Sequence, residues 1–275
     1  MLDQWLLPQP NSPLHRLFGS VDIIEITSPS DAIKSYIGTE IMESYRDWDY
    51  LKFNFEQQPE AELRKYINDY VLPSDKNQIN KNVRQGDFAE VLSSMIVSFF
   101  QKRVVPLKKM RWKFNKDRSV FCTDMMAHNE GDTISDIFYY EIKSRLGIKK
   151  ETVKDVSDYV TVHAHNSLLK DEQSPNEGIA DFLSRFHFAA GDLAESTKFR
   201  DIVLNPTNYN KTFELFFIIE TSEFDTAILD ALENLPPSLK PLFVTIVLIK
   251  NLGDLVIEVQ KKAIQRAVDF VYPQP

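Results

Sequence analysis

The 275-residue chain is 43% hydrophobic, which is enough for a sizeable core, and it carries a formal net charge of −8. Its single cysteine, Cys122, excludes an intramolecular disulfide and fits a reducing compartment. The first residues lack a basic leader and a long apolar region, and the longest apolar runs are far too short to span a bilayer. We therefore expect a cytoplasmic protein with no membrane partner.

The first 83 residues are expected to form an N-terminal α+β extension. After an irregular arm, the predicted elements are a strand over residues 21–27, a helix over 30–46, a strand over 48–55 and a helix over 59–72. The polar stretch over residues 73–83 then marks the best internal boundary. We interpret the extension, residues 1–83, as a candidate partner-docking surface.

Residues 84–275 are expected to form the core domain, in which helices and strands alternate. The predicted helices cover residues 84–101, 151–168, 177–194 and 223–235. The predicted strands cover residues 106–114, 120–127, 137–144, 213–221 and 242–250, and a mixed strand-to-helix segment covers 255–272. This order predicts an α/β fold, with a mixed central sheet and helices on both of its faces.

Two of the predicted strands carry ionisable side chains among apolar ones. Asp124 interrupts the apolar run 120–127, and Glu141 and Lys143 lie within strand 137–144. Because side chains alternate between faces along a strand, Glu141 and Lys143 are predicted to point the same way. Charges inside strands that are covered on both faces are costly unless something compensates them. A metal ion held by the two acids, with the lysine beside it, would supply that compensation.

Glu90 lies on the predicted helix 84–101, on the side opposite its apolar face. Two interpretations remain open for this residue. The helical pattern favours an ordinary exposed glutamate, whereas the functional alternative places the carboxylate over the mouth of an active-site cleft.

Basic residues gather on both sides of the acid-and-lysine strands, although the chain as a whole is acidic. Residues 102–118 contain eight Lys/Arg and one acid, and a second basic cluster follows strand 137–144. A solvated basic edge and a phosphate-contacting surface are both consistent with this pattern. The candidate nucleic-acid-binding residues are Lys108, Lys109, Arg111, Lys113, Arg145, Lys149 and Lys150.

The order of these residues resembles the PD-(D/E)XK nuclease superfamily, which has the restriction-endonuclease-like fold. A helix with Glu90 precedes a strand with Asp124, and the next strand ends in the triplet Glu141-Ile142-Lys143. The resemblance implies hydrolysis of DNA phosphodiester bonds with Mg²⁺, or alternatively Mn²⁺, held by Asp124, Glu141 and the backbone carbonyl of Ile142. It further implies that Glu90 holds a metal-bound water or a second ion. Lys143 would orient or help deprotonate the attacking water.

The superfamily resemblance covers roughly residues 84–221. Within it, the stretch Gly-Asp-Phe-Ala-Glu that ends at Glu90 is similar to the HamA family, the nuclease effectors of the Hachiman antiphage defence system. That similarity implies a helicase partner, which holds the nuclease inactive until it senses aberrant DNA. We therefore expect a metal-dependent deoxyribonuclease that acts on DNA under helicase control. The alternatives are a stand-alone restriction or repair endonuclease, and a catalytically inactive nuclease-fold binding module with a structural Glu-x-Lys ion pair.

Overall fold

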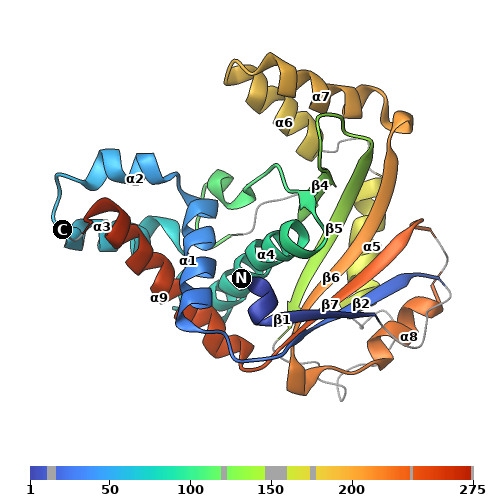
Figure 1. The fold of residues 1–275 in the computed structure, drawn as a ribbon, viewed down its shortest axis with the longest axis horizontal. Coiled ribbons are helices and arrows are strands. Elements are labelled where there is room, and N and C mark those ends of the chain that lie inside the picture. Colours follow the sequence, from blue (N-terminus) through green and yellow to red (C-terminus); the bar gives the residue numbers. More distant parts are fainter. Residues whose placement is uncertain (11–16, 119–122, 146–159, 174–177, 236–237, 274–275) are drawn as a thin grey trace.

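The computed structural model describes residues 1–10, 17–118, 123–145, 160–173, 178–235 and 238–273. In this part of the chain, helices cover both faces of one seven-stranded sheet (Figure 1). The predicted α/β class with a mixed central sheet is therefore confirmed.

The sheet has the strand order β1-β2-β7-β6-β5-β4-β3. The neighbours β2, β7, β6 and β5 run parallel, whereas β1, β4 and β3 pair antiparallel with their neighbours. The strands are β1 (Leu6–Pro10), β2 (Gly19–Glu25), β3 (Arg103–Val104), β4 (Met125–Asn129), β5 (Asp136–Arg145), β6 (Asn210–Glu220) and β7 (Leu242–Ile249).

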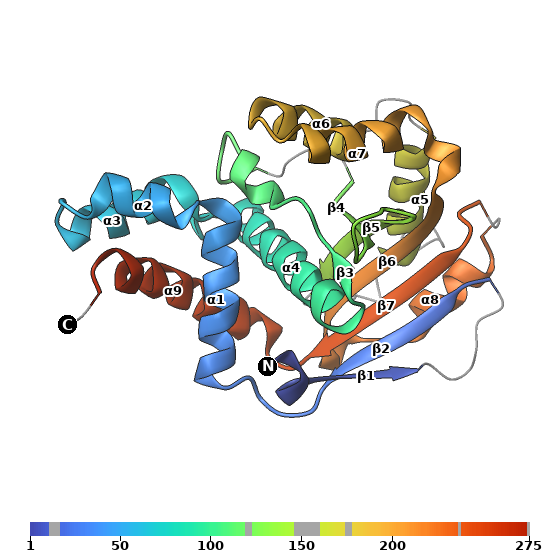
Figure 2. The same cartoon turned by 45° about the horizontal axis from the view of Figure 1, so that its top comes forward.

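The helices form two layers and a projecting hairpin (Figure 2). They are α1 (Asp31–Tyr45), α2 (Trp48–Phe55), α3 (Glu60–Tyr66), α4 (Gln78–Phe100), α5 (Val160–Glu172), α6 (Gly178–Ala189), α7 (Leu193–Leu204), α8 (Ala227–Glu233) and α9 (Leu252–Val271). A π-helical turn, Ile67–Val71, continues α3, and a 3₁₀ turn, Lys109–Trp112, lies between β3 and β4.

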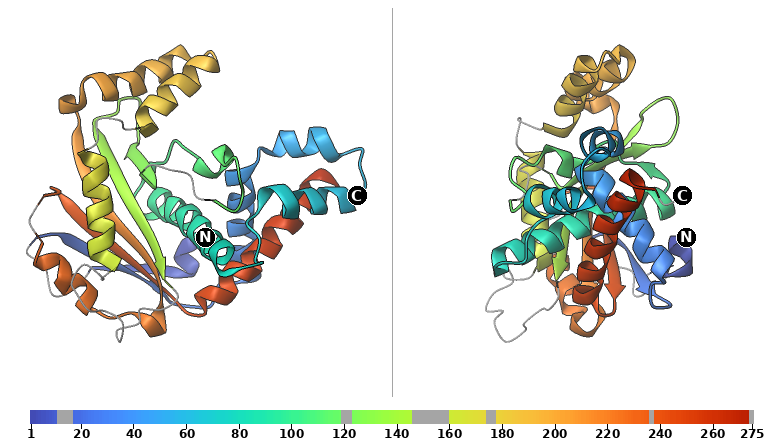
Figure 3. Two further views of the ribbon diagram at one scale, coloured as in Figure 1. Left: turned by 180° about the vertical axis from the view of Figure 1, so that it is seen from behind. Right: turned by 90° about the vertical axis from the view of Figure 1, so that its left-hand side faces the viewer.

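The core consists of one apolar cluster on each face of the sheet, because neighbouring residues of the central strands point in opposite directions. On β6, Phe216 and Ile218 pack with α1, α4 and α9, whereas Phe217 and Ile219 pack with α5 and α8. Figure 3, seen from behind, shows α5 crossing the face of the sheet opposite to α4 and α9. A third cluster joins the α6–α7 hairpin to β4 and β5.

Three sequence predictions of secondary structure are wrong. Residues 48–55 form helix α2 rather than a strand, because the Asp47 side chain accepts hydrogen bonds from the backbone of Asp49 and Tyr50 and so caps a helix. Residues 106–114 form no strand and contain the 3₁₀ turn instead. Residues 255–271 of the predicted mixed segment 255–272 belong to the single helix α9, whose apolar residues recur at helical spacing.

Most other elements agree with the sequence prediction apart from their ends. Strands β5, β6 and β7 and helix α1 lie where they were predicted, whereas β1, β3 and α7 were not anticipated. Strand β4 begins only at Met125, so Asp124 precedes it. Residues 119–122, with Cys122, and residues 146–159 lie outside the described part of the chain. The division at residue 83 stays a prediction, and α4 runs across it.

Candidate active site

The four predicted catalytic side chains come from three segments that meet beside β5. Helix α4 supplies Glu90, the residue just before β4 is Asp124, and β5 supplies Glu141 and Lys143. The backbone N–H of Ile142 donates a 2.8 Å hydrogen bond to Asp124 Oδ2. This bond fixes the Asp124 carboxylate next to Glu141 and Lys143 on β5.

On β5, the predicted common orientation of Glu141 and Lys143 is confirmed. The Lys143 ammonium donates a 2.5 Å hydrogen bond to Glu141 Oε1 and lies 4.0 Å from Asp124 Oδ2. The side chain of Glu141 is only 5% exposed and that of Lys143 is 32% exposed. Ile142 points the other way and joins the apolar cluster that packs against α4. Lys143 is thus the member of the group that reaches toward solvent.

Glu90 is mostly buried, with a side chain that is 19% exposed, so the interpretation as an ordinary exposed glutamate is wrong. Its Oε2 has no hydrogen-bond partner among the described residues, but it lies 3.7 Å from the ammonium of Lys109. The same Lys109 ammonium is 3.7 Å from Asp124 Oδ1. The helical pattern of α4 could not reveal this, because the burial comes from the segment between β3 and β4, which crosses over α4.

The electrostatics of the group reflect several carboxylates gathered away from water. Burial raises the pKa of Glu90 to about 8; the Lys109 ammonium opposes this shift and Asp124 adds to it. Burial also raises the pKa of Glu141, with a further contribution from Asp124. Burial lowers the pKa of Lys143, but Asp124 and Glu141 outweigh it, and the pKa lies above its usual value. Lys143 therefore carries an ammonium at neutral pH.

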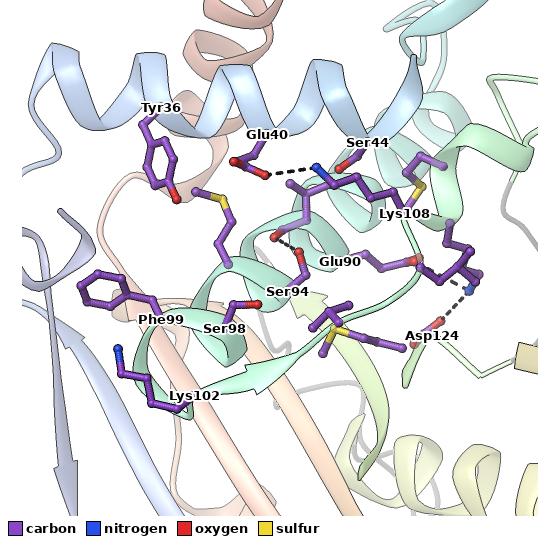
Figure 4. A pocket seen from close by; sticks show the side chains of 17 residues that line it. Tyr36, Glu40, Ser44, Glu90, Ser94, Ser98, Phe99, Lys102, Lys108 and Asp124 are labelled. Carbon is purple, nitrogen blue, oxygen red and sulfur yellow. Dashed lines mark hydrogen bonds and ion pairs between the residues drawn. The ribbon is translucent and has the colours of Figure 1, made fainter. Parts of the chain in front are cut away.

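A cavity of about 350 Å³ opens beside Glu90 and Asp124, between α1, α4 and the segment that follows α4 (Figure 4). Ser94 and Ser98, one helical turn apart, lie on the α4 wall, and Lys102 lies at the far end from Asp124. Glu90 and Asp124 thus line this cavity, whereas Glu141 and Lys143 do not. The other residues that line the cavity include Tyr36, Glu40, Ser44, Phe99 and Lys108.

The structure separates the predicted nucleic-acid-binding residues into exposed and buried ones. Arg145 is exposed at the end of β5, and Lys108 and Arg111 are partly exposed but contact α1 or Asp47. Lys109 and Lys113 are buried, with side chains 6% and 3% exposed, which argues against a direct phosphate contact for either. Lys149 and Lys150 lie outside the described residues.

Two partnerships at the site escaped the sequence prediction. Lys109 lies between Glu90 and Asp124, and Lys113 pairs with Asp87, one turn before Glu90 on α4. The Tyr45 hydroxyl from α1 donates to the same Asp87 carboxylate. The only signal in the sequence was Asp87 itself, an acid three residues before Glu90, on the same side of the helix.

The residues present fit a divalent cation. Three carboxylates and a backbone carbonyl are hard oxygen donors of the kind that Mg²⁺ prefers. One of the carboxylate oxygens, Glu90 Oε2, is buried without a hydrogen-bond partner among the described residues, and burial and mutual repulsion raise the pKa of two of the acids. In the described part of the chain, no three acidic, histidine or cysteine side chains are grouped closely enough to hold an ion as they stand. Ligation would therefore require the carboxylates to draw together.

The mixed sheet with helices on both faces, and the acids and lysine beside β5, define an α/β protein whose architecture fits a nuclease-like fold. The family model of HamA matches residues 21–263, most of the chain, and the protein belongs to the HamA family. This membership places it among effectors associated with Hachiman defence. A comparison with curated proteins gave no match. Among the helices of the described residues, none is long and apolar enough to cross a membrane.

Proposed function

We propose that this HamA-family chain is the Mg²⁺-dependent DNA nuclease effector of a Hachiman antiphage defence complex. The observation that carries the proposal is the junction of Asp124 with β5, where the Ile142 N–H holds the Asp124 carboxylate beside Glu141 and Lys143. An aspartate, a second acid and a lysine at one point of a sheet are the groups that metal-assisted phosphodiester hydrolysis needs.

Asp124, Glu141 and the carbonyl of Ile142 would hold the ion, and Glu90 would complete the oxygen set from the α4 side. Mg²⁺ supplies charge stabilisation for the phosphodiester and makes a nucleophile from water available near neutral pH. The raised pKa of Lys143 keeps its side chain cationic. It is therefore suited to orienting the water and contacting a phosphate oxygen, rather than to accepting a proton. Its 32% exposure lets it reach a substrate from solvent.

Control by a helicase partner fits the distribution of charge. The chain carries a net charge of −8, so long-range electrostatics oppose the approach of free DNA. Among the basic residues predicted to contact DNA, Lys109 and Lys113 are buried, which reduces the positive surface near the site. A partner that binds DNA and delivers it to the cluster would overcome this repulsion. Family membership supports such a partner, and we place the complex in the cytoplasm.

The test is a gel assay with supercoiled and linear DNA, in Mg²⁺ or EDTA, with and without the proposed helicase partner. The variants are Glu141→Gln and, as a matched control, Glu62→Gln on exposed helix α3. We expect Mg²⁺-dependent cleavage that needs the helicase and is lost only in Glu141→Gln.

The remaining outcomes separate the alternatives. Cleavage of defined DNA by the chain alone would indicate a stand-alone endonuclease. If DNA stays intact in every mixture, or if Glu141→Gln cleaves at the wild-type rate, the proposed catalytic role is wrong. The first of these two results would favour a catalytically inactive binding module.

A further inference from the structure

The position of Lys109 is the feature of this site that the proposed function leaves unexplained. Its ammonium lies 3.7 Å from Glu90 Oε2 and 3.7 Å from Asp124 Oδ1, and 3.4 Å from the carbonyl oxygen of Thr123. The side chain is 6% exposed. A cation is therefore already present between two of the carboxylates that would ligate a metal, and it belongs to the chain itself.

We propose that Lys109 is a built-in counter-ion of the Glu90–Asp124 pair, which a divalent cation must displace before the site is complete. This inference rests on the proposed function, since it concerns the regulation of the same site. An ammonium and a divalent cation compete for the same oxygen atoms, and they repel each other at contact distance. Lys109 would thus lower the affinity of the resting chain for Mg²⁺.

The backbone around Lys109 is held on both sides by contacts to α1 and α4. Before it, Lys108 lies 2.8 Å from Glu43 Oε1 and 3.7 Å from Glu40 Oε2, both on α1. After it, Arg111 Nε donates a 3.0 Å hydrogen bond to the carbonyl oxygen of Glu43. The location of the ammonium is therefore set by the packing of its segment on α1.

A second set of contacts holds the segment that contains Lys109 against α4. The buried Lys113 ammonium pairs with Asp87 on α4, and the Tyr45 hydroxyl from α1 donates to that carboxylate. Because Lys113 is held by Asp87, it serves as an internal control for the accessibility of Lys109. Both lysines are buried, but only Lys109 contacts the proposed metal ligands.

The first experiment measures Mn²⁺ binding to the chain without DNA, by isothermal titration at pH 8.5. We compare wild type with Lys109→Gln, which keeps the side-chain length and removes the charge, and with Lys261→Gln on the exposed face of α9 as control. Loss of a positive charge beside the ligands should tighten Mn²⁺ binding at least about tenfold in Lys109→Gln only. Equal or weaker binding in Lys109→Gln would overturn the counter-ion role and leave the proposed nuclease intact.

The second experiment uses the wild-type chain, so it does not depend on the folding of a variant. An amine-reactive ester labels accessible lysines with and without Mn²⁺, and mass spectrometry reads each site. We expect Lys109 to be protected without the ion and labelled with it, whereas Lys113 stays protected in both. If Mn²⁺ binds and Lys109 stays protected, the displacement does not occur. If Mn²⁺ binds to neither the wild type nor Lys109→Gln, the proposed metal site is itself wrong, and the inference falls with it.

Discussion

Lys143 lies two residues after Glu141 on the same face of β5, with its ammonium 2.5 Å from Glu141 Oε1. The Glu141 carboxylate is buried, and both burial and the nearby Asp124 raise its pKa. Lys143 therefore offsets the repulsion between two acids that share a poorly solvated space. The two members of the pair should not contribute equally to stability.

We expect Lys143→Met to destabilise the metal-free protein more than Glu141→Gln. The first change leaves two carboxylates without their shared counter-ion and should cost about 1–3 kcal/mol of unfolding free energy. The second leaves Lys143 partly exposed and still 4.0 Å from Asp124. Urea denaturation in EDTA measures both, with Lys261→Met as the surface control. An equal cost for the two variants would contradict this account of the pair.

The raised pKa of Glu90 predicts how stability depends on pH in the metal-free protein. Its pKa is about 8 in the folded chain, above its usual value of 4.5, so the folded state retains a proton that the unfolded state loses. The contribution of Glu90 is therefore fully present below pH 4.5 and is lost as the pH rises through 8. The Tm of Glu90→Gln should therefore rise relative to that of wild type as the pH rises, and the difference should reach roughly 5 °C at pH 9. Thermal melts in EDTA measure this, and parallel curves for the two proteins would refute it. Glu62→Gln should follow the wild type.

Two helical glycines provide a matched test of packing around the site. A Cβ on Gly38 of α1 would lie 2.8 Å from the backbone N of Ala263 on α9, whereas a Cβ on Gly86 of α4 would meet no described atom within 4 Å. Gly38→Ala should therefore destabilise the protein by about 1–3 kcal/mol through overpacking of α1 on α9. Gly86→Ala should stabilise it by about 0.5–1 kcal/mol, since alanine favours the helix. Chemical denaturation of both variants decides this, and a destabilised Gly86→Ala would contradict it.

The sequence predicted the parts of the site that depend on strand periodicity. Alternation along β5 correctly put Glu141 and Lys143 on one side and Ile142 on the other. The long apolar runs of β6 and β7 likewise identified buried strands, because strands that are covered on both faces are apolar along their length. These features depend only on residues that are close in the sequence, so they can be predicted from a single sequence.

The features that the sequence missed depend on contacts between distant segments. Glu90 contacts Lys109, nineteen residues later, and a helical pattern registers only neighbours on its own helix. The basic run 106–114 was predicted to be a strand that contacts nucleic acid, yet its lysines 109 and 113 turn inward to acids on α4. A run of charged residues in a sequence is normally interpreted as solvent-exposed. The acids that pair with such residues and bury them are brought near only by the tertiary fold.

The buried Lys113–Asp87 pair gives the sharpest test of that inward orientation. Both side chains are at most 7% exposed, and Tyr45 also donates to Asp87. Removing one member of the pair therefore leaves the other as a buried charge without its ionic partner. Asp87→Asn should cost about 3–5 kcal/mol in unfolding free energy. The double variant Asp87→Asn with Lys113→Met should cost clearly less than the sum of the two single variants, because no charge is left unpaired.

The same variants separate a structural from a nucleic-acid-binding role for Lys113. A buried lysine that pairs with an acid does not release counterions from DNA, so its loss should leave the salt dependence of binding unchanged. We therefore expect the double variant, once shown by circular dichroism to be folded, to bind DNA within about twofold of wild type. Arg145→Gln at the exposed end of β5 should weaken binding and reduce the salt slope by about one. Fluorescence anisotropy at several salt concentrations, with the helicase partner present, measures both slopes. If the salt dependence of binding is shallower in the double variant and unchanged in Arg145→Gln, then Lys113 contacts DNA and Arg145 does not.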